Sequence, residues 1–129
     1  MRLRPDDLPA AAIDFLTERH LATLTTLRSD GTPHVVAIAF TFDAVTATAR
    51  VITNGPSLKA RNVGAGGPTA LCQVEGRRWL TLEGRGVVVT DPDEVQDAVE
   101  RYAVRFRQPR VNPQRVLVKI AVDRVMGNI

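Results

Sequence analysis

Residues 69–89 read TALCQVEGRRWLTLEGRGVVV, and this stretch decides the fold. Two runs rich in apolar residues and Thr flank Glu75-Gly76-Arg77, a sequence typical of a tight reversal between antiparallel strands. Gly84 and Gly86 interrupt the second run, and a glycine within a strand marks a bulge or a bend. The stretch therefore predicts a long hairpin, with strands at 69–74 and 78–89, that bends as the strands of a small barrel must bend.

Four further strands are expected around this hairpin. Residues 20–27 and 34–42 flank a polar segment whose Asp30-Gly31 pair suits a hairpin turn. The second of these strands contains Val35 to Phe40, which is apolar on both faces and therefore favours a central position in the sheet. Residues 49–53 form the next strand, and residues 116–122 form the last one.

Two short helices are expected. The first follows Asp7, a good capping residue, has Pro9 in its first turn and closes at Glu18-Arg19-His20. The second begins at Ser57 and extends for one or two turns to Val63, directly after the break at Asn54-Gly55-Pro56.

A third helix, from Pro92 to about Phe106, has the clearest pattern in the chain. Asp91 is a good N-cap, and Glu94 completes a pattern like a capping box. The apolar stripe of this helix consists of Val95, Ala98, Val99, Tyr102 and Phe106. Six strands and two to three helices in 129 residues predict one domain, residues 1–129, of the mainly β (α+β) class, built as a six-stranded antiparallel barrel.

The composition favours a soluble protein with anionic partners. Lys and Arg outnumber Asp and Glu by 17 to 14, which gives a formal net charge of +3. Cys72 is the single cysteine, so no disulfide framework is possible and a reducing compartment is expected. No apolar run approaches the roughly 20 residues of a membrane span, and the N-terminus lacks an apolar signal segment. We therefore expect a cytoplasmic protein with no membrane partner.

Several classes of chemistry lack the residues they need. Two histidines, His20 and His34, and one cysteine without a partner do not make a metal site. No Gly-x-Ser-x-Gly turn, Gly-rich dinucleotide motif or Walker lysine loop occurs. A basic nucleic-acid-binding barrel would need exposed aromatic residues among its cations. The chain has only four Phe, one Trp and one Tyr, so no nucleic-acid partner is expected.

The segment Val51 to Asn62 remains as a candidate anion site. It predicts a strand, a turn and the start of a helix, whose free backbone N–H groups favour anions. Ser57 adds a hydroxyl there, and Lys59 and Arg61 add positive charge. A capped surface helix with two solvated cations has the same pattern, so the segment by itself leaves both interpretations open.

At these residues the chain resembles the flavin-binding split-barrel superfamily that includes pyridoxamine 5′-phosphate oxidase. Ile52-Thr53-Asn54 and Ser57-Leu58-Lys59 match the strand end and the phosphate-binding Ser-Arg-Lys turn of that family, with Leu58 in place of the arginine. This difference disfavours FMN, the commonest cofactor of the family. The C-terminal substrate segment of the oxidase has no match, so pyridoxamine oxidation is not expected.

A likeness over nearly the whole chain is to the actinobacterial branch of this family that uses the deazaflavin coenzyme F420, which includes biliverdin reductases. The matching segments are residues 15–22, 33–37, 50–53, 73–76, 78–80 and 107–113. The resemblance implies a split β-barrel of the FMN-binding type and a homodimer with the cofactor in a groove between the subunits.

The resemblance also implies roles for individual residues. Ser57, Lys59, Arg61 and Asn62 would meet the phosphate and acidic tail of the coenzyme. Val35, Val36, Ala37 and Thr53 would line its ring system, and Gln73, Arg78 and Trp79 would close the site, with Trp79 alternatively a core or dimer residue. Arg107 and Arg110 belong to a cationic cluster that suits the propionates of a tetrapyrrole. No catalytic residue stands out, and no metal is implied.

The function implied is that of an oxidoreductase. Reduced coenzyme F420 would deliver a hydride to a conjugated small-molecule acceptor, with biliverdin, which becomes bilirubin, as the leading candidate. Two alternatives remain: an FMN-dependent reductase of the same fold, and a non-catalytic protein that stores the coenzyme.

Overall fold

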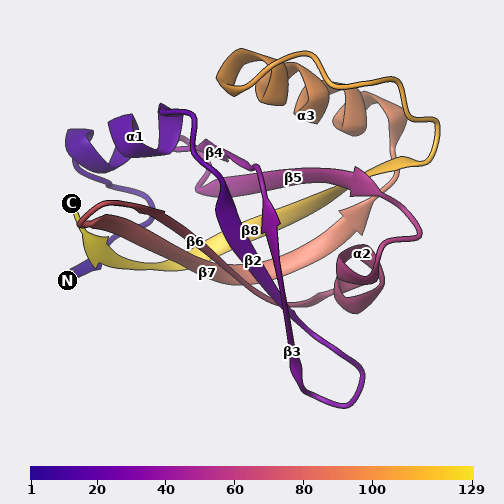
Figure 1. The fold of residues 1–129 in the computed structure, drawn as a ribbon, viewed down its shortest axis with the longest axis horizontal. Coiled ribbons are helices and arrows are strands. Elements are labelled where there is room, and N and C mark those ends of the chain that lie inside the picture. Colours follow the sequence, from indigo (N-terminus) through magenta and orange to yellow (C-terminus); the bar gives the residue numbers. More distant parts are fainter.

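The computed structural model describes residues 1–129, which form one antiparallel sheet with three helices against it (Figure 1). The strands are β1 (Arg2–Leu3), β2 (Ala22–Leu27), β3 (Pro33–Ile38), β4 (Thr41–Asp43), β5 (Thr48–Asn54), β6 (Gly67–Glu75), β7 (Arg78–Val89) and β8 (Arg115–Asn128). The helices are α1 (Ala10–Thr17), α2 (Leu58–Val63) and α3 (Pro92–Arg105). No helix is both long enough and apolar enough to cross a membrane.

The sheet has eight strands rather than the six expected, in the order β3-β2-β6-β7-β8-β5-β4, with β1 paired to β8. Its two end strands, β3 and β4, do not pair with each other, so the strongly curled sheet stays open on one side. The expected strand 34–42 is divided into β3 and β4, and the other additional strand is the two-residue β1. A two-residue strand at a chain end leaves too little periodicity to be recognised from sequence.

The hairpin of β6 and β7 forms as predicted. Glu75 pairs with Arg78, and Gly76 between them has a φ of 61°. The pairing of β7 with β8 shifts register between Glu83 and Gly84, which is the bulge that the glycine indicated. A side chain on Gly84 would run into the backbone of Ala121, so β8 can approach β7 this closely only because residue 84 has no Cβ.

The interior of the curled sheet is filled by side chains from alternate strand positions. The largest fully buried side chains are Phe15, Phe40, Leu24, Leu71, Leu80, Leu82, Leu117, Ile120, Gln73, Val51, Val63 and Val118. Phe15 lies on α1, which covers one end of the sheet (Figure 1). All but one of these side chains are apolar, and the exception, Gln73, requires hydrogen-bond partners inside the molecule.

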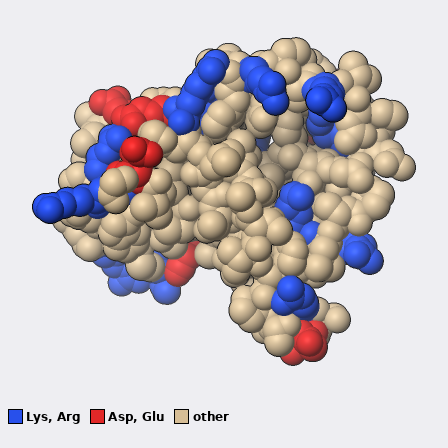
Figure 2. Space-filling view, viewed as in Figure 1, with Lys and Arg blue, Asp and Glu red and all other residues tan.

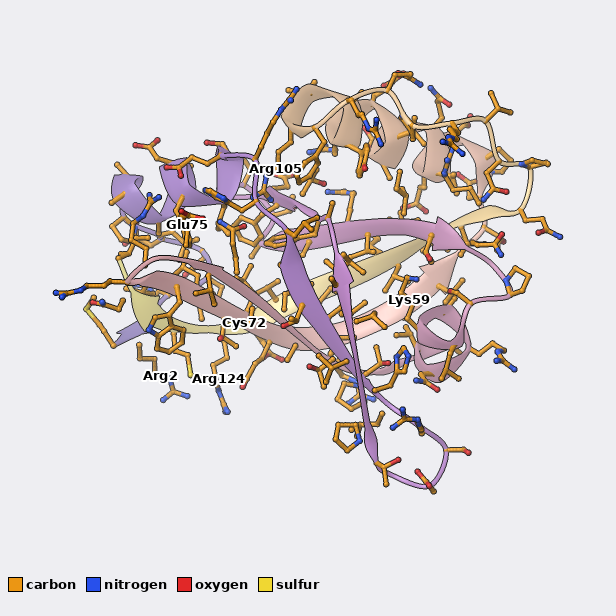
Figure 3. The ribbon with its side chains drawn as sticks, viewed as in Figure 1. Arg2, Lys59, Cys72, Glu75, Arg105 and Arg124 are labelled. Atoms are coloured by element: carbon orange, nitrogen blue, oxygen red, sulfur yellow. The ribbon has the colours of Figure 1, made fainter.

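A buried arginine supplies one of those partners. Arg105, in the last turn of α3, donates to the carbonyl oxygens of Glu18 and Phe40 and to Oε1 of Gln73. The Arg105 side chain lies where the end of α3 meets the end of α1 (Figure 3). These bonds fix the C-terminal end of α3, and therefore the start of the loop over residues 106–114, relative to the sheet.

The predicted helices are confirmed, with two corrections at their caps. Asp91 caps α3 by accepting a hydrogen bond from the N–H of Glu94, but the Glu94 carboxylate binds Nζ of Lys119 instead of completing a capping box. At α1 the N-cap is Pro9, with no side-chain cap, whereas the backbone of Asp7 belongs to a preceding turn. The cap of a helix end depends on where the chain comes from, which the residue type alone does not fix.

The central position expected for residues 34–42 is wrong. The strand stops at Ile38, and β3 is an edge strand that pairs only with β2. Val35 and Ala37 are exposed on its outer face, although their sequence is as apolar as that of a buried strand. An apolar outer face on an edge strand indicates a surface that something else covers. The last strand also extends six residues beyond the expected end at Val122.

Candidate functional site

The open side of the sheet exposes two unpaired strand edges. β3 pairs with β2 alone. β4 pairs with β5 only at Thr48 to Arg50, so Val51 to Asn54 have no strand neighbour on that side. Backbone N–H and C=O groups along these two edges are therefore available to a ligand.

A cavity of about 260 Å³ lies where these edges end. Six separate parts of the chain line it: the end of β3, the end of β5, α2, α3, the loop 106–114 and the start of β8. The lining residues are Ile38, Ala39, Ile52, Thr53, Asn54, Lys59, Tyr102, Pro109, Asn112 and Arg115. We call this cavity the cleft. Figure 2 shows a hollow beneath α3 with Lys and Arg side chains around it and no acidic side chain beside it.

Lys59 is the predicted site residue that the structure places most clearly in the cleft. It stands on α2 and lines the cleft beside the end of β5 (Figure 3). Burial of its ammonium group holds the pKa of Lys59 below its ordinary value of 10.5. No carboxylate is paired with it, so an anion in the cleft would provide the missing charge partner.

Thr53 and Ser57 lie next to each other at the same end of the cleft. Thr53 lines the cleft, and its hydroxyl oxygen lies 3.4 Å from Oγ of Ser57. Ser57 also caps α2 by accepting from the N–H of Ala60, as the sequence predicted. When the Thr53 hydroxyl is the donor of this pair, the Ser57 hydroxyl is free to donate to a ligand.

Of the four predicted anion-binding residues, only Lys59 is part of the cleft lining. Ser57 lies beside the lining residue Thr53, and the other two lie further from the cleft. Asn62 donates from Nδ2 to Oγ1 of Thr26 at 3.0 Å, which ties α2 to β2. Arg61 is exposed on α2. Both lie within one or two turns of Lys59, yet the helix turns their side chains in different directions.

The predicted ring-lining residues of β3 lie just short of the cleft, which is lined by Ile38 and Ala39 instead. Val35 and Ala37 point to the exposed outer face, whereas Val36 points inward and packs against the core. Because successive side chains of a strand alternate between faces, these three cannot share one surface. Contact between a cofactor and these three residues stays a prediction. Their backbone groups at the strand edge suit such contact better than their side chains do.

Gln73 is not at the cleft. It is completely buried, donates from Nε2 to the carbonyl oxygen of Phe15 at 2.8 Å, and accepts from Arg105. With both ends of its amide used inside the barrel, Gln73 has the geometry of a core residue.

Arg78 and Trp79 also lie away from the cleft of their own chain. Arg78 forms two hydrogen bonds of 3.0 Å with the carboxylate of Glu18 and stacks over the ring of Phe15. Trp79 pairs with Val74 on one side and Asn128 on the other, at the start of β7. These residues can reach a cofactor only if it is bound by another copy of the chain.

Sequence reasoning missed Tyr102, Asn112 and Arg115 in the cleft. Tyr102 fits the apolar stripe of α3, and Asn112 belongs to the matching segment 107–113 without a role of its own. In the structure Nδ2 of Asn112 lies 3.5 Å from Oδ1 of Asn54, and the Gly55 N–H donates to the Gln114 carbonyl. The loop 106–114 is thereby held beside the end of β5.

Of the two predicted substrate residues, Arg107 is exposed away from the cleft, and Arg110 lines a neighbouring cavity.

The curled, open sheet with a basic cleft between two free edges defines a split-barrel ligand-binding protein. The chain belongs to the pyridoxamine 5′-phosphate oxidase family, whose sequence model matches residues 8–128. It is 56% identical over 117 residues to the F420H2-dependent biliverdin reductase of Mycobacterium tuberculosis, covering 91% of this chain and 85% of that protein.

Two solved structures have the same fold. A protein described as an F420 reductase superposes with a TM-score of 0.71 at 25% identity, over 92% of this chain and 98% of that one. A conserved hypothetical protein of Mycobacterium tuberculosis superposes with a TM-score of 0.73 at 22% identity, over 94% of this chain and 84% of that one. These likenesses confirm the predicted split-barrel fold.

Proposed function

We propose that this chain binds coenzyme F420 in the cleft and reduces biliverdin to bilirubin. The observation that supports this most directly is the cleft itself, which combines two unpaired strand edges with Lys59 and Arg115 and has no carboxylate in its lining. The 56% identity to an F420H2-dependent biliverdin reductase supports the choice of deazaflavin and acceptor.

The residues present fit a deazaflavin with an anionic tail. Unpaired N–H and C=O groups of β3 and β5 can pair with the polar edge of a planar heterocycle, as they would with another strand. Binding of a phosphate at the end of β5 is supported by Lys59, which lines the cleft, and by the Ser57 hydroxyl beside Thr53. Ile38 and Ile52 supply apolar surface that excludes water from the ring.

When bound, the reduced deazaflavin supplies a hydride, which is two electrons and one proton, and is left oxidised. The acceptor in this proposal is the central methine of biliverdin, and a second proton comes from solvent to complete the reduction. The chain's contribution is to hold the two planar systems against each other and to keep water out. No side chain of the cleft is assigned as the proton donor.

A homodimer forms part of this proposal. The outer faces of β2, β3 and β6 expose large apolar side chains, with Leu27 41%, Val35 56% and Val74 58% exposed. Val35 lies opposite Thr25 on β2, so these residues share one side of the sheet. A second copy is the natural cover for such a face. Arg78 and Trp79 would then close the cleft of the partner.

A cytoplasmic location is also proposed, in line with the free thiol of Cys72.

Cofactor titration tests the first half of the proposal. Purified protein is titrated with coenzyme F420 and separately with FMN, and binding is followed by ligand fluorescence. We expect binding of coenzyme F420 at least about 10-fold tighter than that of FMN, which corresponds to about 1.4 kcal/mol. Tight FMN binding without binding of coenzyme F420 would support the FMN-dependent reductase instead.

A further inference from the structure

Next to the cleft lies a second, larger cavity of about 410 Å³, between α3 and the loop 106–114. It is lined by Thr90, Pro92, Val95, Gln96, Val99, Gln108, Pro109, Arg110, Val111, Asn112, Pro113 and Arg115. We propose that this cavity, the side cavity, binds a carboxylate group through Arg115 and Arg110. The inference rests on the proposed function, because it assigns the place where a carboxylate of the acceptor or of the coenzyme tail is held.

The side cavity and the cleft share part of their walls. Pro109, Asn112 and Arg115 line both cavities. Arg115 is the only charged residue of the three, so its guanidinium group stands at the boundary between them. A ligand that reacts in the cleft and extends an arm past Arg115 would enter the side cavity.

The guanidinium group of Arg115 is held in place and lacks an ionic partner. Arg115 begins β8 directly opposite Asn54, and its Nη2 donates to the carbonyl oxygen of Arg110 at 2.6 Å. No carboxylate lies within ion-pair distance of Arg115 or Arg110, because neither occurs among the salt bridges of the chain. A guanidinium group positioned in this way keeps donors free for an incoming anion.

Three of the five acidic residues on or just before α3 have partners elsewhere, and none of the five lines the side cavity. Glu94 binds Lys119 at 2.8 Å, Asp97 binds Arg101 at 2.9 Å, and Asp91 caps the helix. The lining of the side cavity therefore contains two arginines and no acid, although acidic residues occur on the same helix. This arrangement favours an anionic ligand over a cationic or neutral one.

The apolar part of the lining favours a carboxylate over a phosphate. Val95 and Val99 form one wall on α3, and Pro109 belongs to the opposite wall on the loop. A singly charged carboxylate on an aliphatic arm buries its arm against these walls and presents two oxygens to a planar guanidinium group. A dianionic phosphate would lose more hydration on the same surface. Both a propionate of biliverdin and the acidic tail of the coenzyme have carboxylate chemistry.

Paired binding measurements separate the two sources. Arg115→Gln and Arg110→Gln each remove one charge, and Arg110→Gln leaves the carbonyl oxygen that holds Arg115. Arg77→Gln is the matched control, because Arg77 is exposed on the turn between β6 and β7, outside both cavities. The probes are biliverdin, its dimethyl ester and coenzyme F420, and binding is measured by absorbance or fluorescence without turnover.

If the side cavity holds a propionate, Arg115→Gln weakens biliverdin binding by about 10-fold or more, the loss of a charge-assisted bond. The dimethyl ester then binds the wild-type and variant chains equally. If the cavity holds the coenzyme tail, the same variant weakens binding of coenzyme F420 and leaves biliverdin unchanged. Either result supports the inference when Arg110→Gln, which alters only the side cavity, weakens binding of the same probe and Arg77→Gln changes neither.

Unchanged binding of both probes in Arg115→Gln and Arg110→Gln, with a wild-type chain that binds both, would overturn this inference alone. A wild-type chain that binds neither coenzyme F420 nor biliverdin would overturn the proposed function, and the inference with it. Arg115→Lys provides a further check, because an ammonium group retains charge without the planar fork and is expected to restore part of the affinity.

Discussion

Nη2 of Arg105 donates a hydrogen bond to Oε1 of Gln73 across 2.7 Å in the interior of the barrel. Every other acceptor of this guanidinium group is a backbone carbonyl, from Glu18 or Phe40. Desolvation by burial lowers the pKa of Arg105 to about 10. The arginine remains in the core because it joins α3, α1 and the sheet through neutral oxygens.

Arg105→Met is expected to lower the free energy of unfolding by about 3 kcal/mol, because it leaves several buried acceptors without a donor. Urea unfolding at neutral pH measures the change. Arg101→Met on the same helix is the control, since it removes partly exposed ion pairs with Asp97 and Asp43 and is expected to cost less than about 1 kcal/mol. An equal decrease in the free energy of unfolding in the two variants would show that the buried hydrogen bonds of Arg105 stabilise the fold no more than the ion pairs of Arg101 do.

Gln73→Leu separates a core role from a cofactor role for Gln73. The substitution leaves the Phe15 carbonyl and the Arg105 guanidinium group each short of a partner, so the melting temperature is expected to fall. At a temperature where the variant is folded, its dissociation constant for coenzyme F420 is expected to stay within about 2-fold of wild type. This change is smaller than the loss of one hydrogen bond to the coenzyme would cause. A large loss of coenzyme F420 binding with an unchanged melting temperature would instead indicate that Gln73 contacts the coenzyme.

Glu18 makes the stability depend on pH in the acid range. Hydrogen bonds from Arg78 and then from His20 lower the pKa of its carboxyl group from 4.5 to about 2. Because folding favours the ionised form, this stabilisation is complete above pH 4.5 and is lost as the pH falls toward about 2. We expect the stability difference between wild type and Glu18→Gln, from urea unfolding, to shrink across that window. A difference that stays constant from neutral pH to pH 2 would contradict this assignment.

Lys59 should make coenzyme binding depend on pH in the alkaline range. Its pKa lies below the ordinary 10.5, and an anionic ligand binds the protonated form better. The dissociation constant for coenzyme F420 should therefore be flat at neutral pH and rise as the pH passes the lowered pKa. Lys59→Gln should weaken binding about 10- to 100-fold at neutral pH and remove this alkaline rise. An alkaline rise that persists in Lys59→Gln would assign the titration to another group.

Local chemistry is the part of this fold that the sequence predicts well. Ser57 and Asp91 cap helices and Gly84 permits a bulge through interactions within a few residues or with the next strand, so residue type and spacing are sufficient. Lys59 could be predicted for the same reason, because the turn before α2 determines where it stands.

The remaining features depend on segments that are distant in the sequence. Whether β3 is central or at an edge depends on which strands meet, and an apolar edge strand has the same composition as a buried one. Arg105 was not predicted to be buried because its acceptors come from residues 18, 40 and 73. Arg115 was missed because its place between two cavities requires the loop 106–114 to lie against the end of β5.

Anaerobic oxidation of reduced coenzyme F420 by biliverdin, in the presence of catalytic amounts of the protein, tests the central claim most directly. Coenzyme oxidation and bilirubin formation are followed together by absorbance. We expect the two to proceed in a ratio of about one to one over many turnovers, because one hydride reduces one bilin. Binding of the reduced coenzyme without bilirubin formation would rule out the proposed reaction and would identify the chain as a coenzyme carrier.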